Sequence, residues 1–220
     1  MERFELIVQT LFESNNLTEK QRQILKAAVQ LFSEKGYAAT STSEIAKLAQ
    51  VAEGTIFRHY RTKKELLLAI VGPFMEKIAD SYIVNDLTNL LKKDYQRPED
   101  LLSAIIENRR DIIVQFLPLL KIILQELPFH PELREHFLQL ISDNMYHRVV
   151  EVINDYQQKG MLKKLPPTAI AKFAITNILG HLFTRYVLFP HLEWDDVRDT
   201  EQLIQLIMNG IGNSDSKVES

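Results

Sequence analysis

Cysteine is absent from the 220 residues, which excludes structural disulfides and thiolate chemistry. Glycine is scarce, with seven residues, and no run of about 18 uncharged apolar residues occurs. The amino end carries Glu2 and Glu5, unlike the basic start of a secretory signal. We therefore expect a cytoplasmic protein that is neither exported nor inserted into a membrane.

Charge is distributed unevenly along the chain. The net charge of −3 would by itself argue against a nucleic-acid binder. Residues 18–64, however, contain nine Lys or Arg and four Glu, a net charge of +5, so the remainder carries −8. A small basic module on an acidic body is expected when only one part of a protein meets phosphate.

Apolar residues recur at spacings of three and four, and no segment sustains the two-residue alternation of a strand. The prediction is an all-α fold. Helices are expected near residues 18–35, 41–49, 53–60, 62–78, 98–116, 118–127, 131–159, 167–188 and 196–211, with a loop or ragged helix end over 85–97.

Several residues mark where these helices begin, end or bend. Gly36 suits a left-handed helix end, and the spacing of Ser41 and Glu44 has the S-x-x-E form of a capping box. The Gly72–Pro73 pair should bend the fourth helix. Two short helices after a longer supporting helix predict a helix-turn-helix, whose last helix enters the major groove of DNA.

The same segment resembles the signature of the TetR/AcrR family of transcriptional regulators. The resemblance covers roughly the length of a helix-turn-helix domain and is carried by GYAATS at 36–41, IAKLA at 45–49, GTIFRHY at 54–60 and KKEL at 63–66. It implies a three-helix DNA-binding domain followed by a helical ligand-binding and dimerisation domain. We divide the chain accordingly into an extension with a short helix (1–17), a DNA-binding domain (18–64), a ligand-binding and dimerisation domain (65–212) and a disordered tail (213–220).

The candidate DNA contacts all lie within the helix-turn-helix. Hydroxyl groups near the start of the second helix can donate to phosphate, and small residues at the start of the third allow close approach to the duplex. The resemblance places further positions at the groove, with Lys63 on phosphate; we assign a guanine contact to Arg58 and a thymine-methyl contact to Phe57. The predicted set is Thr40, Ser41, Ser43, Glu53, Gly54, Thr55, Phe57, Arg58, His59 and Lys63.

Three positions depart from the family pattern. Gln50 stands where a turn glycine is usual, Ala52 replaces a serine cap, and Phe57 often appears as tyrosine. Left-handed geometry at Gln50 would cost about 1 to 2 kcal/mol. The sequence leaves three alternatives open for Glu53: contact with a cytosine base, stabilisation of the helix N-terminus, or exposure to water.

The predicted helix 167–188 carries apolar residues on more than one side, so it can pack on its own domain and on a partner, and the predicted helix 196–211 is strongly apolar on one side. By the resemblance, these last two helices pair with their copies in a four-helix homodimer interface. The alternative is that these stripes belong to the chain's own core. The predicted dimerisation residues are Ile175, Ile178, Leu182, Tyr186, Leu203, Ile207 and Ile211.

A small-molecule pocket is expected where isolated polar groups interrupt apolar helices, because pockets are largely apolar with a few orienting donors. His181 has an ordinary core role as its alternative, and Arg109 can instead reach solvent. The predicted pocket residues are Arg109, Gln115, Phe116, Tyr146, Phe173, Asn177, His181 and Phe183.

Together these features predict a transcriptional repressor that binds a pseudo-palindromic double-stranded DNA operator as a homodimer and is released by an apolar or amphipathic effector. Swinging of the helix bent at Gly72–Pro73 is a candidate route for that release. No H-E-x-x-H, Walker or G-x-S-x-G pattern occurs, so we expect neither an enzyme nor a cofactor or metal. The alternative is a DNA-binding scaffold regulated by a protein partner.

Overall fold

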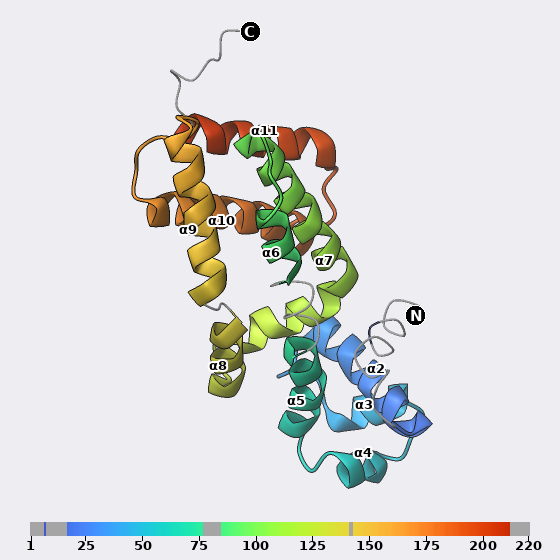
Figure 1. The fold of residues 1–220 in the computed structure, drawn as a ribbon. Helices are drawn as coiled ribbons and strands as arrows, with labels where there is room; N and C mark the ends of the chain where they lie inside the picture. Colours follow the sequence, from blue (N-terminus) through green and yellow to red (C-terminus); the bar gives the residue numbers. More distant parts are fainter. Residues whose placement is uncertain (1–6, 8–16, 77–84, 141–142, 212–220) are drawn as a thin grey trace. The chain divides into compact units, whose positions relative to one another are not determined.

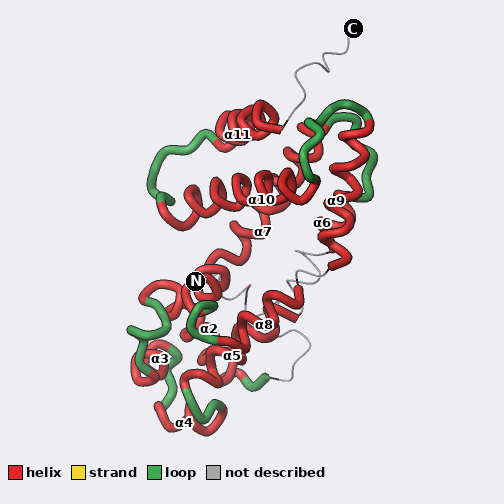
Figure 2. Tube along the Cα trace, turned by 90° about the vertical axis from the view of Figure 1, so that its left-hand side faces the viewer, coloured by secondary structure: helices red, strands yellow, loops and turns green. Residues whose placement is uncertain are grey.

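The computed structural model describes residue 7 and residues 17–76, 85–140 and 143–211, apart from the side chains of 136–140 and 143–146. Within this part the chain forms helices and connecting loops and contains no extended strand (Figures 1 and 2). The predicted all-α fold is confirmed. No helix among the described residues is both long enough and apolar enough to cross a membrane.

The helices follow the predicted order with several changes at their ends. Their bounds are α2 Glu19–Lys35, α3 Thr42–Leu48, α4 Glu53–His59, α5 Lys63–Pro73, α6 Asp86–Leu91, α7 Pro98–Glu126, α8 Pro131–Leu140, α9 Asp143–Gln158, α10 Pro167–Phe183 and α11 Asp196–Ile211, with a π-helical turn, η2 Thr184–Leu188, after α10.

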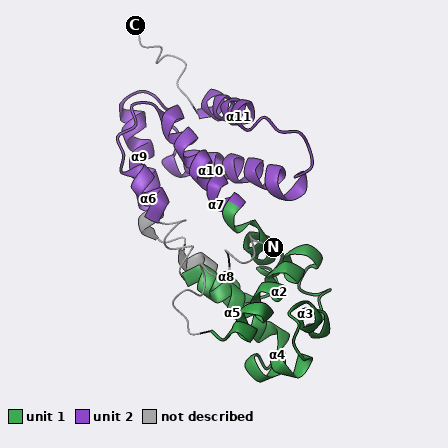
Figure 3. Ribbon diagram, turned by 90° about the vertical axis from the view of Figure 1, so that its right-hand side faces the viewer, with its two compact units in different colours: residues 1–82, 115–140 green, residues 83–114, 141–220 purple. Residues whose placement is uncertain are grey.

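The chain separates into two compact units (Figure 3). Unit 1 contains Met1–Tyr82 and Gln115–Leu140, and unit 2 contains Ile83–Val114 and Ile141–Ser220. Helix α7 contributes to both, and its backbone leaves helical geometry at Phe116, with φ −110° and ψ 18°. The division into domains at residue 65 stays a prediction, as do the extension and the tail, whose residues lie almost entirely outside the described part.

Unit 1 is built around the buried face of α2, which includes Ile24, Leu25 and Phe32 and packs against α3 and α5. The helix begins with a capping box at Thr18. It ends at Gly36, whose φ of 87° confirms the predicted positive angle, although ψ is 154° rather than left-handed helical.

One sequence prediction was wrong in the middle of the chain. The segment 85–97 contains a regular helix, α6, because its leucines are partly buried and the helix packs against α9. The predicted helices 98–116 and 118–127 are present as the two arms of α7, which meet at a kink at Phe116, just before Pro118.

Two further boundaries also differ from the predictions. The predicted helix 131–159 is assigned as α8 and α9. Helix α5 ends at Pro73, followed by π-helical geometry at 74–76. The hinge proposed at Gly72–Pro73 stays a prediction, because residues 77–84 lie outside the described part.

Unit 2 has its own core, formed by the inward faces of α7, α9, α10 and α11. Helices α10 and α11 lie side by side within it (Figure 1). The ring of Phe173 on α10 rests on Gly210 of α11, where an added Cβ would approach the ring to 3.2 Å. Glycine at position 210 therefore permits this close contact between the two helices.

Candidate nucleic-acid interface

Helices α3 and α4 are joined by a tight turn that requires one unusual backbone conformation. Gln50 has a φ of 55°, so the left-handed geometry whose cost was considered for this position, where a glycine is usual, is present. The next residue, Val51, closes the turn by donating from its backbone to Ala46 at 3.0 Å. Ala52 precedes α4 without a side-chain capping bond, as its methyl group dictates.

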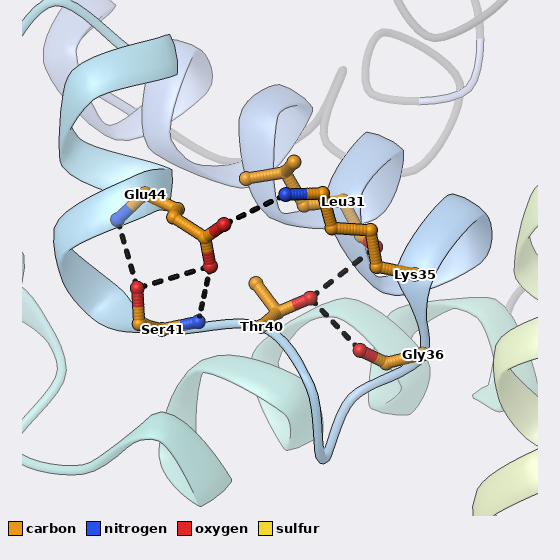
Figure 4. Close-up of polar contacts among 6 residues, drawn as sticks. All are labelled: Leu31, Lys35, Gly36, Thr40, Ser41 and Glu44. Carbon is orange, nitrogen blue, oxygen red and sulfur yellow. Dashed lines mark hydrogen bonds and ion pairs between the residues drawn. The ribbon is translucent and has the colours of Figure 1, made fainter.

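Helix α3 begins with the predicted capping box (Figure 4). Ser41 Oγ accepts from the Glu44 backbone at 3.1 Å, and the Ser41 backbone donates to Glu44 Oε2 at 2.9 Å. Lys35 at the end of α2 reaches the same carboxylate at 2.7 Å. The bond from Lys35, followed by those from Ser41, lowers the pKa of Glu44 to about 2.

The prediction that the Thr40 hydroxyl donates to phosphate was wrong. Thr40 is 1% exposed, and its hydroxyl lies 2.8 Å from Gly36 O and 3.3 Å from Leu31 O (Figure 4). A hydroxyl group has a single proton to donate, and here it satisfies carbonyls at the end of α2. Thr40 therefore stabilises the loop before α3 from within.

Lys63 is also engaged inside the protein. Its Nζ donates to Tyr37 O at 2.8 Å and to Thr40 O at 2.9 Å, and it lies 4.4 Å from the centre of the Tyr37 ring. An ammonium group has three protons, and two of them are committed to this loop. A phosphate contact by Lys63 stays a prediction, whereas its bonds to the loop are an observed role that the sequence did not reveal.

Helix α4 is held by its inner side and presents its outer side. Ile56 and Tyr60 are buried, as predicted. Gly54 and Arg58 are exposed, and the Phe57 side chain is 45% exposed, an uncommon position for a phenylalanine. A Cβ added at Gly54 would meet no protein atom within 4 Å, so the surface ahead of the helix start is open.

The remaining predicted DNA contacts lie around this surface. Ser43 is exposed on α3, while Thr55 and His59 are half-buried on α4. Glu53 has a partner that the sequence did not suggest, since the Thr42 hydroxyl donates to its carboxylate at 2.6 Å. The sequence alone does not indicate this hydrogen bond, because Thr42 and Glu53 are eleven positions apart on different helices.

The predicted pocket residues are divided between the two units. Gln115 and Phe116 belong to unit 1, where Phe116 is fully buried and meets Phe74 edge to face. The others belong to unit 2, apart from the side chain of Tyr146, which lies outside the described part.

Within unit 2, the predicted pocket residues have contrasting environments. Phe173 and Phe183 are 42% and 39% exposed, and their role as walls of a ligand site stays a prediction. Asn177 donates from its amide to Phe173 O at 2.7 Å. Burial lowers the pKa of Arg109 to about 10, against an opposing effect of Asp86, and burial also lowers the pKa of His181.

Four predicted dimerisation residues instead fill the core of unit 2. Ile178, Leu182, Ile207 and Ile211 are at most 6% exposed, as the alternative interpretation held. Tyr186 and Leu203 pack partly buried against the same core. The assignment of the four buried residues to a partner contact was wrong, because a stripe on an isolated helix does not show which buried surface it joins.

Other apolar side chains of α10 remain exposed. Ile175, the one predicted dimerisation residue that faces outward, is 45% exposed. It shares one side of α10 with Leu179 and Phe183, which follow at spacings of four residues and are 52% and 39% exposed. Ile175, Leu179 and Phe183 are called the outer apolar face below.

Comparisons with known proteins agree with this architecture. Residues 24–70 match the model of the bacterial regulatory proteins of the tetR family. A helix-turn-helix-type transcriptional regulator of Bacillus subtilis, YvkB, is 29% identical over 164 residues, which are 74% of this chain and 82% of the relative.

Two solved structures share the fold. A transcriptional regulator from Saccharomonospora viridis, crystallised with choline, aligns with a TM-score of 0.63 at 18% identity over 89% of this chain and 99% of its own. The regulator FadR from Bacillus subtilis, crystallised with stearoyl-CoA, aligns with a TM-score of 0.58 at 21% identity over 86% and 97%. With its helix-turn-helix in the matched segment, the chain carries a DNA-binding domain of the TetR family of transcriptional regulators.

Proposed function

We propose that this regulator is a cytoplasmic repressor that binds a pseudo-palindromic DNA operator as a homodimer and is released by a small effector. The observation that carries the proposal is the division of α4 into two sides. Ile56 and Tyr60 anchor the helix, while Gly54, Phe57 and Arg58 are presented outward. A recognition helix needs this arrangement, since base edges are read by side chains that the protein itself does not bury.

Each exposed group has a chemical partner in the major groove. The Arg58 guanidinium can donate two bonds to guanine, and the Phe57 ring can pack on a thymine methyl group. Ser43 can donate to phosphate, as can the Ser41 side chain if it exchanges its Glu44 partner. His59 and Thr55 lie on α4, the helix that also carries Phe57 and Arg58.

For dimerisation we propose the outer apolar face in place of the buried stripe. Large apolar side chains gathered on one surface mark a protein interface more often than scattered ones do. Two copies joined by a symmetric contact would present two α4 helices to successive major grooves, about 34 to 36 Å apart. This geometry is the reason to expect an inverted-repeat operator.

For the effector we propose an apolar or amphipathic small molecule that binds among the helices of unit 2. The structural relatives above were crystallised with choline and with stearoyl-CoA, both of which combine polar and apolar parts. Arg109, which is half-buried on α7 and is influenced by the charge of Asp86 on α6, is the polar residue that best suits an anionic end. A site of this kind would be largely apolar with few orienting groups.

The deciding experiment is selection of bound fragments from a random DNA pool, followed by a release screen with small molecules. Enrichment of an inverted repeat with half-sites one helical turn apart is the expected result. Enriched sequences without such symmetry would contradict the dimeric readout. Operator binding that no small molecule releases, but that a protein from the same cell does, would favour the scaffold alternative.

A further inference from the structure

The DNA-binding helices are held from a second direction by a distant part of the chain. The segment from Glu126, at the end of α7, to Glu132, at the start of α8, is called the α7–α8 corner here. It belongs to the same compact unit as α2 to α5 (Figure 3). It approaches the loop of residues 36–41, called the cap loop, which ends at the N-cap of α3.

The corner is a turn in which the buried Glu126 carboxylate contacts the half-buried His130 ring. Glu126 is 8% exposed, and its Oε2 lies 3.3 Å from His130 Nε2. The backbone of His130 donates to Glu126 O at 3.1 Å. A buried carboxylate is costly without such a partner, so the pair fixes where the His130 ring stands.

The His130 ring in turn packs on Tyr37 in the cap loop. The two rings meet edge to face at 5.7 Å, and Phe32 meets Tyr37 in the same manner at 5.2 Å. Burial, followed by the nearby Glu126, raises the pKa of Tyr37. Tyr37 is thus enclosed by α2 and by the corner.

Lys63 connects Tyr37 to the start of α3. Its ammonium group contacts the Tyr37 ring and binds the carbonyls of Tyr37 and Thr40, the residue immediately before the N-cap Ser41. An exposed ion pair, in which Lys64 Nζ lies 2.7 Å from Glu132 Oε1, also joins the corner directly to α5. Exposed pairs of this kind contribute about 0 to 1 kcal/mol, so the enclosed Tyr37 is the more important connection.

We propose that the α7–α8 corner is a positioning element for operator recognition, which acts through Tyr37 and Lys63 to hold the cap loop where α3 and α4 fit the DNA. His130 and Glu126 touch no base or phosphate in this role. The inference rests on the proposed operator binding. It identifies residues outside the helix-turn-helix on which sequence-specific affinity depends.

The test measures the affinity of full-length variants for the enriched operator and for a scrambled duplex. His130→Ala should weaken operator binding by between about 5-fold and 150-fold, the usual range of coupling between separate sites. Binding to the scrambled duplex should stay within 2-fold, since it depends on the basic residues alone. Tyr37→Leu should have the same effect. Tyr37→Phe keeps the aromatic ring, so it should bind the operator as wild type does.

A double variant and a matched control complete the design. The double variant His130→Ala with Tyr37→Leu should bind no more weakly than the worse single variant, because both changes interrupt one connection. Phe129→Ala removes an aromatic ring from the same corner, but this ring is 76% exposed, so operator binding should be unchanged. Melting temperatures verify that each protein is folded at the assay temperature, and His130→Gln replaces His130→Ala if the alanine variant unfolds.

The outcomes separate this inference from the function on which it rests. If a folded His130 variant binds the operator within 2-fold of wild type, the corner has no positioning role. If His130→Ala weakens both duplexes equally, its effect is not on recognition and the inference is also overturned. If wild-type protein enriches no sequence at all, the proposed function fails, and this inference fails with it.

Discussion

The hydroxyl group of Thr42 on α3 donates a 2.6 Å hydrogen bond to the carboxylate of Glu53, the first residue of α4. This bond joins the two helices of the DNA-binding motif across their turn. It also offers Glu53 a role within the protein, in addition to the roles proposed from the sequence.

Breaking the Thr42–Glu53 bond should cost stability from either side. Thr42→Val and Glu53→Ala should each lower the free energy of unfolding by about 1 kcal/mol, the net contribution of a typical hydrogen bond. The double variant should lose no more than the larger single loss, as denaturant titration would show. Additive losses, or relaxed preference at one base pair in Glu53→Ala alone, would instead assign Glu53 to base reading.

Replacing Gln50 by glycine should stabilise the protein. The φ of 55° costs a residue with a side chain about 1 to 2 kcal/mol, while glycine adopts this angle without strain. Part of that gain is offset by the larger backbone entropy of glycine in the unfolded chain, so we expect a rise of about 0.5 to 1 kcal/mol in the free energy of unfolding. Gln50→Ala keeps the strain and is the control; a Gln50→Gly protein that melts below wild type would contradict the prediction.

The capping box at Glu44 should make stability depend on pH in the acid range. Bonds from Lys35 and Ser41 lower the folded-state pKa of Glu44 to about 2 from an ordinary value of 4.5. Its stabilising effect is therefore complete above about pH 4.5 and is lost as pH falls towards 2. Melting temperatures of wild type and Glu44→Gln should converge over this interval, and a difference that stayed constant would show that the carboxylate charge does not matter.

Arg58 should determine base preference at one position of each half-site. Arg58→Ala should reduce discrimination there by about 1 to 3 kcal/mol, since a bidentate contact to guanine is lost. Binding to operators already mutated at that base pair should change little. Lys20, exposed at the start of α2, provides the control, and equal loss of preference in Lys20→Ala would contradict a special role for Arg58.

The outer apolar face should control the oligomeric state. Leu179 is 52% exposed, so Leu179→Arg should leave the core of unit 2 intact while separating the dimer into folded monomers. Light scattering measures the mass and circular dichroism measures the helix content. Leu124→Arg is the control, because Leu124 is 49% exposed on α7 in unit 1. A Leu179→Arg protein that remained dimeric would place the interface elsewhere.

Much of the DNA-binding region could be predicted because its signals are local. The capping box at Ser41 and the inward sides of α2 and α4 each depend on residues within about one or two helical turns. Such signals can be recognised without knowledge of any long-range contact. Periodicity alone, by contrast, could not foresee the regular helix α6, which is stabilised by packing against α9.

Side-chain roles were harder to predict wherever the partner lies far along the sequence. The Thr40 hydroxyl could donate to phosphate by its chemistry. Because Thr40 is buried within the cap loop, however, its hydroxyl donates to the Gly36 carbonyl instead. Ile178 and Ile207 have the periodicity of an interface, but they meet one another's helices inside unit 2. A hydrophobic stripe reports that a surface is buried and not which surface covers it.

The sequence by itself determined the helical class, the basic helix-turn-helix and the family, because these follow from period, charge and a short motif. Only the tertiary structure decided that Lys63 binds the cap loop, that His130 packs on Tyr37 and that Ile175 and Leu179 are left uncovered. The physical reason is that each of these depends on which distant segment occupies the neighbouring space. The hydrogen bonds and the burial of a side chain depend on the segments that surround it. Composition and residue spacing do not identify those segments.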